Sequence, residues 1–139
     1  ISACLVGSEM CIRDSNTPIE ALEMELPVRV RRYALRYGSG GNGRYRGGDG
    51  ICRELSFLVP ATVTLLTDRR KRAPYGLHGG EDGSVGINTL ERNGTLSQLP
   101  GKATFDVQVG DILSICTPGG GGFLPCDTGK AASNDATRV

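Results

Sequence analysis

Glycine is concentrated in a few short stretches of this chain, and that distribution constrains the fold more than any other feature. The 139 residues include 21 glycines, gathered mainly in GSGGNGRYRGGDG at residues 38–50 and PGGGG at residues 118–122. They follow no G-x-y period, so neither a collagen helix nor a uniform flexible linker accounts for them. The glycine stretches predict loops whose backbone takes positive φ or packs closely against other backbone.

The segments between the glycine stretches alternate apolar and polar residues with the period of a β-strand. Val28 and Val30 alternate with arginines, whereas Tyr33 and Leu35 continue the alternation in the opposite phase. A change of phase within one strand is typical of a β-bulge, which we expect near residues 31–32.

Turn residues indicate how the strands connect. Pro60-Ala61 separates two alternating segments and predicts a hairpin between them, and Asn93-Gly94 is the strongest two-residue hairpin turn in the chain. Only the segment before Pro27 favours a helix, with Thr17 as its cap and Pro18 at its first position. The fold class predicted is mainly β: a compact antiparallel sandwich or barrel-like domain with long Gly-rich loops and one short N-terminal helix.

We expect one domain over residues 16–123. Residues 1–15 differ from the rest in composition and resemble translated adapter sequence, so they are interpreted as non-native. The chain does not start with Met, and we expect it to begin within a longer gene. The polar tail over residues 124–139 is predicted to be disordered.

Composition argues against several partners. The net charge of +1 gives no general attraction to nucleic acid or to a membrane surface, and no apolar run approaches the length of a membrane span. The five cysteines show no close-paired spacing, which makes zinc ribbons and disulfide frameworks improbable. Cys52 and Cys116 lie in apolar strand contexts and are interpreted as inert, buried, reduced thiols of a cytoplasmic protein.

Two glycine motifs invite a nucleotide or phosphate interpretation. Gly38, Gly40 and Gly43 satisfy G-x-G-x-x-G, but a dinucleotide site needs a helix after this motif and no helical pattern follows. The amide groups of PGGGG could meet an anion, or the segment could be a tight turn that packs against a neighbouring subunit. No P-loop pattern for ATP is present.

Residues 69–72 form the only basic run of the chain. Such a run could bind phosphate, carboxylate or a nucleic-acid backbone, although a solvated loop is the more common outcome. His78 is the only histidine and cannot build a catalytic zinc site, which needs about three protein ligands. Asp68 and the pair Glu81-Asp82 lie in the same loop, so they could contribute to a site that is completed elsewhere.

Four stretches taken together resemble one family. Their order and spacing are similar to the C-terminal region of the hydantoinase B/oxoprolinase family, and the resemblance covers about residues 16–123. The stretches are NTPIEALE, LPVRVRRYALRYGSGGNGRYRGGDG, TLLTDRRKRAPYGLHGG and LPGKATFDVQVGDILSICTPGGGGF.

The resemblance implies a cytoplasmic, ATP-hydrolysing hydantoinase or 5-oxoprolinase, of which this fragment is not catalytic alone. It implies as partners the upstream part of the same subunit and a hydantoinase A-type subunit or domain, with no nucleic acid or membrane. ATP and a divalent metal are implied for the full enzyme, and no cofactor or metal is expected on this fragment. Asp68, Arg69 and Arg70 are the candidate contacts to substrate or interface. A ketone carboxylase subunit and a non-catalytic β assembly module are the alternatives.

Overall fold

The computed structural model describes residues 18–126. The segment interpreted as non-native, the predicted cap Thr17 and all but the first residues of the predicted tail lie outside this described part. The account below therefore concerns the predicted β domain and the few residues that follow it.

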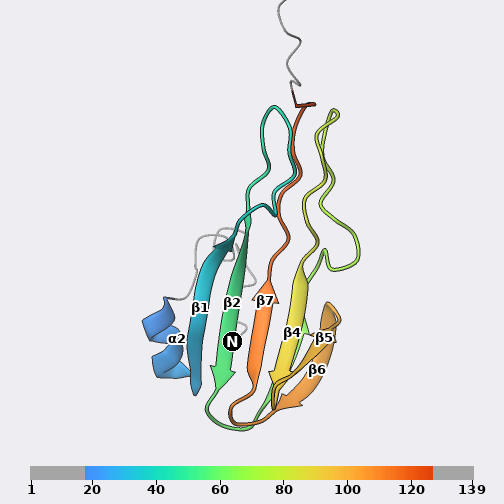
Figure 1. Cartoon of the computed structure of the whole chain (residues 1–139). Helices are drawn as coiled ribbons and strands as arrows, with labels where there is room; N and C mark the ends of the chain where they lie inside the picture. The colour runs from blue at the N-terminus through green and yellow to red at the C-terminus, as the bar shows by residue number, and fades with distance from the viewer. Residues whose placement is uncertain (1–17, 127–139) are drawn as a thin grey trace, which may run out of the picture.

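The one helix of the described part, α2 (Ile19–Glu25), lies beside the edge of the main sheet (Figure 1). Pro18 immediately precedes the helix, one position earlier than predicted, and its carbonyl accepts the first helical hydrogen bond, from the Leu22 N–H at 3.0 Å. Leu22 packs against the hydrophobic core, and the Glu23 carboxylate accepts a 2.7 Å hydrogen bond from the Val30 N–H. These contacts fasten α2 to the first strand.

Seven strands form two antiparallel sheets, which confirms the predicted fold class (Figure 1). The larger sheet has the order β1-β2-β7-β4-β5, and β3 pairs with β6 in a two-stranded sheet. The strands are β1 (Val28–Arg36), β2 (Gly50–Phe57), β3 (Ala61–Leu66), β4 (Ile87–Arg92), β5 (Thr95–Leu99), β6 (Lys102–Val107) and β7 (Ile112–Cys116).

Two local predictions are confirmed and one is wrong. The register of β1 against β2 shifts between Val30 and Arg32, where the bulge was expected. Asn93 and Gly94 both take positive φ in the turn between β4 and β5. The predicted hairpin around Pro60 does not form, because β2 pairs with β1 and β7 while β3 crosses to pair with β6. Alternation specifies that these segments are strands, but not which strands they join.

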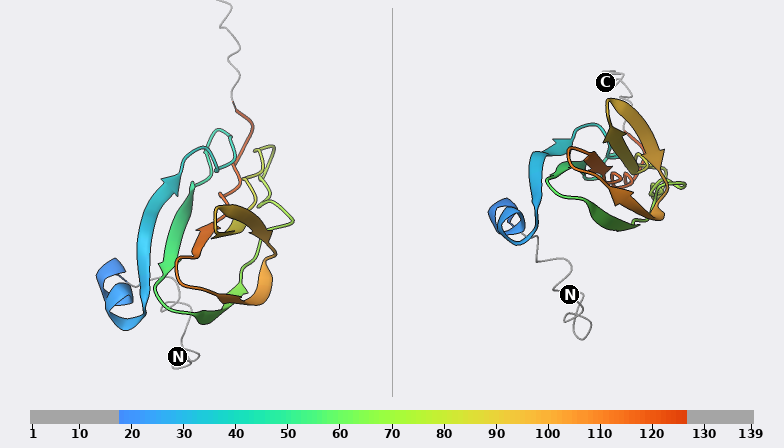
Figure 2. Two further views of the ribbon diagram at one scale, coloured as in Figure 1. Left: turned by 60° about the horizontal axis from the view of Figure 1, so that its bottom comes forward. Right: turned by 90° about the horizontal axis from the view of Figure 1, so that it is seen from below.

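The hydrophobic core lies between the two sheets, which curve toward each other (Figure 2). Val107 of β6 and Leu113 of β7 are 1% and 2% exposed, so this is the most tightly enclosed part of the core. Phe57, Leu65 and Leu90 complete the contact between the sheets. Each of the two sheets thus buries one face against the other, as in other β-sandwiches.

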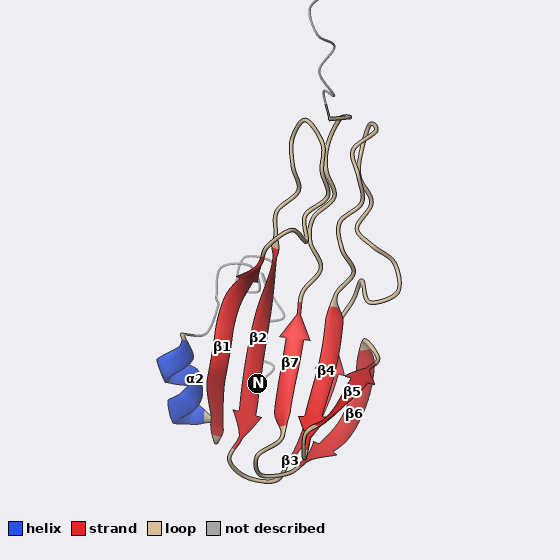
Figure 3. Ribbon diagram, in the orientation of Figure 1, coloured by secondary structure: helices blue, strands red, loops and turns tan. Residues whose placement is uncertain are grey.

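Glycine-rich segments extend together beyond one end of the large sheet (Figure 3). They are the two legs of the β1–β2 loop, the two legs of the loop before β4, and the segment after β7; we call them the glycine bundle. Backbone hydrogen bonds join the legs: the Gly41 N–H donates to the Gly120 carbonyl at 2.8 Å, and the Gly122 N–H donates to the Glu81 carbonyl at 2.8 Å. The PGGGG segment is therefore the central member of a backbone assembly within this chain.

Close packing explains why glycine is required in this bundle. A Cβ on Gly47 would overlap the carbonyl of Gly120, and a Cβ on Gly121 would overlap the carbonyl of Tyr75. Close backbone packing, one of the two expectations for the glycine stretches, is confirmed. Most of the PGGGG amide groups are not available to an anion. The amide groups of Gly119, Gly120 and Gly122 already donate to backbone carbonyls of the neighbouring legs.

Acidic side chains hold the legs of the bundle in place. Asp49 accepts a hydrogen bond from the Gly40 N–H at 3.0 Å, and Asp82 accepts one from the Gly76 N–H at 2.8 Å. Glu81 accepts a 2.9 Å hydrogen bond from the Asn42 amide. Glu81 and Asp82 therefore bind this chain's own loops.

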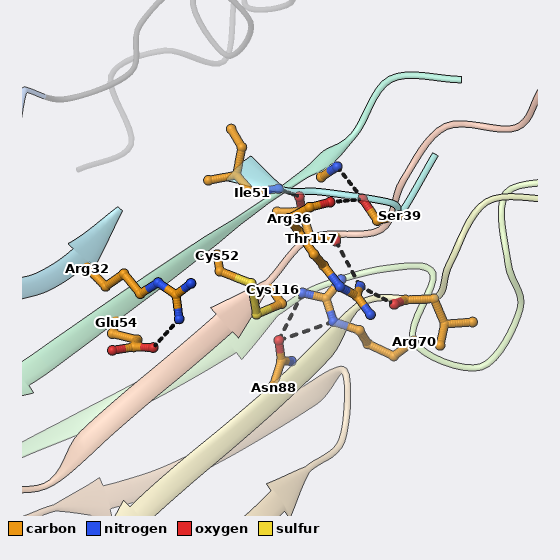
Figure 4. The surroundings of a disulfide bond; sticks show 12 residues. Arg32, Arg36, Ser39, Ile51, Cys52, Glu54, Arg70, Asn88, Cys116 and Thr117 are labelled. Carbon is orange, nitrogen blue, oxygen red and sulfur yellow. Dashed lines mark hydrogen bonds and ion pairs between the residues drawn. A yellow bond between two sulfur atoms is a disulfide. The ribbon is translucent and has the colours of Figure 1, made fainter. Parts of the chain in front are cut away.

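The prediction that Cys52 and Cys116 are separate buried thiols is wrong. The two residues face each other on β2 and β7 with a Cα–Cα distance of 4.1 Å, and their sulfurs form a disulfide (Figure 4). Both are only half-buried, on the sheet face opposite the hydrophobic core. The sequence spacing did not indicate this disulfide, because 64 positions separate the two cysteines.

Candidate functional site

The basic run and the β5–β6 turn enclose a surface cavity of about 620 Å³. Residues 67–72 form one wall and residues 100–102 form the other, and we call this space the basic cavity. The Thr67 N–H and hydroxyl both donate to the Gly101 carbonyl, at 2.7 and 2.8 Å, and thereby hold the walls together. The structure thus brings the three candidate residues Asp68, Arg69 and Arg70 into one wall of a cavity.

Arg70 is the most firmly held of these candidates (Figure 4). Its Nε and Nη2 both donate to the Asn88 Oδ1, at 3.1 and 2.9 Å, and its Nη1 donates to the backbone carbonyl of Asp68 at 2.7 Å. The guanidinium packs on Gly86 and the stem packs on Gly101, where a Cβ would collide with it. Partial burial lowers the pKa of Arg70, and nearby Asp68 opposes this shift. Arg70 is therefore a partly buried, hydrogen-bonded residue and not part of a solvated loop.

Asn88 positions the Arg70 guanidinium, a role that the sequence analysis did not predict. Its side chain is 1% exposed on β4, and its amide donates to the Thr67 hydroxyl at 2.9 Å. Asn88 therefore connects the strand, the start of the basic loop and the guanidinium. A buried asparagine within an alternating strand is the one signal that could have pointed to it.

Arg36 is a second cation that sequence reasoning missed. It lies beside Arg70 at the base of the glycine bundle (Figure 4) and contributes electrostatically to the lowered pKa of Arg70. Its Nη1 donates to the Val85 carbonyl at 2.7 Å and to the Thr117 carbonyl at 3.3 Å. Arg36 thus ties the loop before β4 to the segment after β7.

Asp68 and Arg69 are exposed and free to reach a ligand or a partner. The Arg69 guanidinium lies 5.9 Å from the centre of the Tyr75 ring, and the Arg69 carbonyl accepts a 2.9 Å hydrogen bond from the Gly86 N–H. Arg69 has a φ of 58°, a conformation that is uncommon for a residue with a side chain. The fold therefore fixes the backbone of Arg69 and leaves its side chain available.

His78 does not join the basic cavity. Its ring forms a T-shaped pair with the Phe123 ring, with the centroids 5.3 Å apart. The centroid of the Tyr45 ring is 6.1 Å from that of Phe123. These rings belong to the glycine bundle, so His78 takes part in the packing between its legs.

Residues 18–126 contain no group of three or more His, Cys, Asp or Glu side chains arranged to hold a metal ion. The described residues thus do not fit the divalent metal implied for the full enzyme. No helix in this part of the chain is long and apolar enough to cross a membrane.

The other shifted pKa values have structural causes. The Gly40 N–H and the Arg46 guanidinium lower the pKa of Asp49, which holds the glycine bundle. Hydrogen bonds from Arg92 lower the pKa of Asp111, a buried residue of the β6–β7 turn. Neither carboxylate lines the basic cavity, where Asp68 is the one carboxylate among the lining residues.

The family model described as "Hydantoinase B/oxoprolinase" matches residues 7–125. The chain belongs to the hydantoinase B/oxoprolinase family. It is 43% identical over 108 residues to a 5-oxoprolinase of Dictyostelium discoideum and 46% identical over 108 residues to 5-oxoprolinase 1 of Arabidopsis thaliana. Each of these alignments covers 77% of this chain and 8% of the relative.

A solved structure shares the fold. The crystal structure of the ATP-dependent caprolactamase from Pseudomonas jessenii matches with a TM-score of 0.67 and 25% sequence identity, over 79% of this chain and 20% of that chain. This hydantoinase B/oxoprolinase-type chain therefore spans a fifth or less of these relatives.

Proposed function

We propose that the chain is the C-terminal β domain of an ATP-dependent hydrolase of cyclic amides, and that it supports the reaction without performing it alone. The observation that carries this proposal is the family membership, together with 5-oxoprolinase and caprolactamase relatives that are much longer than the chain. The second part rests on the chain spanning a fifth or less of those relatives.

The chemistry explains why such a domain needs partners. A lactam carbonyl is stabilised by resonance, so its hydrolysis requires activation, which ATP supplies by phosphorylating the carbonyl oxygen. We propose that a hydantoinase A-type part binds ATP and that the upstream part of the subunit holds the reacting atoms and any divalent metal. The substrate, whether 5-oxoproline, a hydantoin or a larger lactam, is selected there. We place this assembly in the cytoplasm.

Within this assembly, we assign Asp68 and Arg69 to contacts with the substrate or with a neighbouring part of the enzyme. Both side chains are exposed in the wall of the basic cavity, and Arg69 projects from a backbone that a hydrogen bond fixes. Arg70 serves as a positioning residue, because Asn88 and the Asp68 carbonyl occupy its guanidinium.

The test is the substitution Arg69→Ala in the intact parent enzyme. We expect the kcat/KM for ATP-dependent amide hydrolysis to fall by about tenfold or more, as happens when one charge-assisted hydrogen bond is lost. Arg29→Ala is the matched control, since Arg29 is exposed on β1 away from the cavity. Unchanged kinetics and assembly in the Arg69→Ala enzyme would reject the assignment.

A further inference from the structure

The basic cavity carries an excess of positive charge. Its lining includes five cationic side chains, Arg69, Arg70, Lys71, Arg72 and Lys102, and a single carboxylate, Asp68. Another cavity, of about 660 Å³, lies on the outer face of the large sheet, but there Arg31 and Arg32 are balanced by Glu54 and Glu91. Cavity size therefore does not distinguish the two spaces, whereas charge does.

Asp68 offsets one of these five positive charges, and no ion pair within residues 18–126 neutralises the others. The ion pairs of residues 18–126 join Arg32 to Glu54, Arg46 to Asp49 and Arg92 to Asp111, so none involves a residue that lines the basic cavity. Lys71, Arg72 and Lys102 are exposed around the opening.

The half-buried cation in the wall is bonded only to neutral acceptors. Arg70 donates to the Asn88 amide oxygen and to the backbone carbonyl of Asp68, which satisfies hydrogen bonds but leaves the charge in place. Arg36 lies behind it and likewise donates only to carbonyls, so two positive charges lie side by side. Partly buried charges are normally paired, and an unpaired arrangement favours an incoming anion.

We propose that the basic cavity binds a small oxyanion, the phosphate or carboxylate group of an organic ligand. The volume of about 620 Å³ lies in the range of small-molecule sites. The rigid Arg70 supplies a fixed positive wall, while Arg69, Arg72 and Lys102 supply mobile donors of the kind that bind phosphate and carboxylate oxygens. The proposal rests on the proposed function in treating the basic loop as a substrate contact and not as an assembly contact.

The experiment is a titration of the full 139-residue chain with inorganic phosphate and, separately, with acetate, followed by NMR at low ionic strength. The test variant is Arg72→Gln with Lys102→Gln, which removes two cationic side chains of the cavity that form no hydrogen bond or ion pair within residues 18–126. The matched control is Arg29→Gln with Arg31→Gln, which removes the same charge from β1. Amide spectra of both variants verify the fold before titration.

We expect saturable binding of at least one anion, with shifts confined to residues 67–72 and 100–102. The test variant should weaken this binding by roughly tenfold or more, and the control by less than twofold. Tighter binding of phosphate assigns a phosphoryl ligand, and tighter binding of acetate assigns a carboxylate. Absence of saturation by both anions, or equal weakening in both variants, overturns the proposal.

The two proposals can fail separately. If the chain does not bind either anion but Arg69→Ala still disables the parent enzyme, the oxyanion site is rejected and the proposed function stands. If the chain binds an anion but the parent has no ATP-dependent amide hydrolysis, the proposed function is rejected and the oxyanion site stands.

Discussion

Individual arginines hold this domain together through acceptors that are distant in the sequence. The guanidinium of Arg70 donates hydrogen bonds to Asn88, that of Arg36 donates to the Val85 and Thr117 carbonyls, and that of Arg92 donates to Asp111. None of these pairs follows from local spacing, and the sequence analysis did not predict them. It did identify the basic run, because consecutive charges are a local sequence pattern. It could not show that the Arg70 side chain is hydrogen-bonded within the fold while the Arg69 side chain is exposed.

Asp111 gives the clearest stability prediction at this scale. Its carboxylate accepts hydrogen bonds from Arg92 at 2.9 and 2.6 Å and from the Gln108 N–H at 2.8 Å, and the residue is 3% exposed. We expect Asp111→Asn to lower the free energy of unfolding by about 1–3 kcal/mol near neutral pH, measured by urea denaturation. Asp106→Asn in the exposed part of β6 is the control, and equal losses in the two variants would contradict this account.

The pair of Asp111 and Arg92 also makes the free energy of unfolding depend on pH. The pKa of Asp111 is lower in the folded chain than in the unfolded chain. Its contribution to the free energy of unfolding is therefore complete above the unfolded pKa of about 3.9, and is lost as the pH falls through the folded pKa. The acid-side decrease in unfolding free energy should therefore be smaller in Asp111→Asn than in the parent chain. Parallel pH profiles for the two proteins would show that this pair does not contribute.

At the scale of elements, the glycine bundle is the least usual part of the molecule. The sequence predicted loops whose glycines take positive φ or pack closely, since their clusters interrupt every regular pattern. It could not predict that the segment after β7 lies between the loops that follow β1 and precede β4, because those contacts join residues 39–49, 74–84 and 118–124. Hydrogen bonding between remote loops depends on the completed sheet beneath them.

Two adjacent glycines test the packing of the bundle. A Cβ on Gly47 would overlap the Gly120 carbonyl, whereas a Cβ on Gly48 meets nothing within 4 Å, and neither residue has positive φ. We expect Gly47→Ala to lower the free energy of unfolding by about 1–3 kcal/mol, as for other overpacked sites. Gly48→Ala should change it by less than about 1 kcal/mol in either direction. Equal effects in thermal or urea unfolding would contradict the close approach.

The disulfide between β2 and β7 is a second element-scale feature. It closes a loop with a sequence separation of 64 residues, so it restricts the unfolded chain considerably. Reduction, or the double substitution Cys52→Ala with Cys116→Ala, should lower the free energy of unfolding by about 2–4 kcal/mol. Cys126→Ala, at an exposed free cysteine, is the control. Full alkylation of Cys52 and Cys116 in the untreated folded chain would contradict the pairing.

At the scale of the whole molecule, residues 18–126 form a β-sandwich with a backbone-bonded extension, which we propose acts together with the catalytic parts of a longer enzyme. Alternating residues predicted the strands, and the Asn93-Gly94 turn predicted one hairpin, because both signals are local. The pairing of β3 with β6 and the joining of Cys52 to Cys116 were not predictable, since each depends on how separated segments meet. The basic cavity is assembled in the same way, from the loop that follows β3 and the turn that leads into β6.

The central claim is that this domain supports cyclic-amide hydrolysis and does not perform it. The most direct measurement is the release of ADP that depends on added 5-oxoproline or hydantoin, compared between the purified chain and the intact parent enzyme. The account predicts turnover by the intact parent and none by the chain alone. Turnover by the purified chain, or full activity of a parent enzyme from which this domain has been removed, would contradict it.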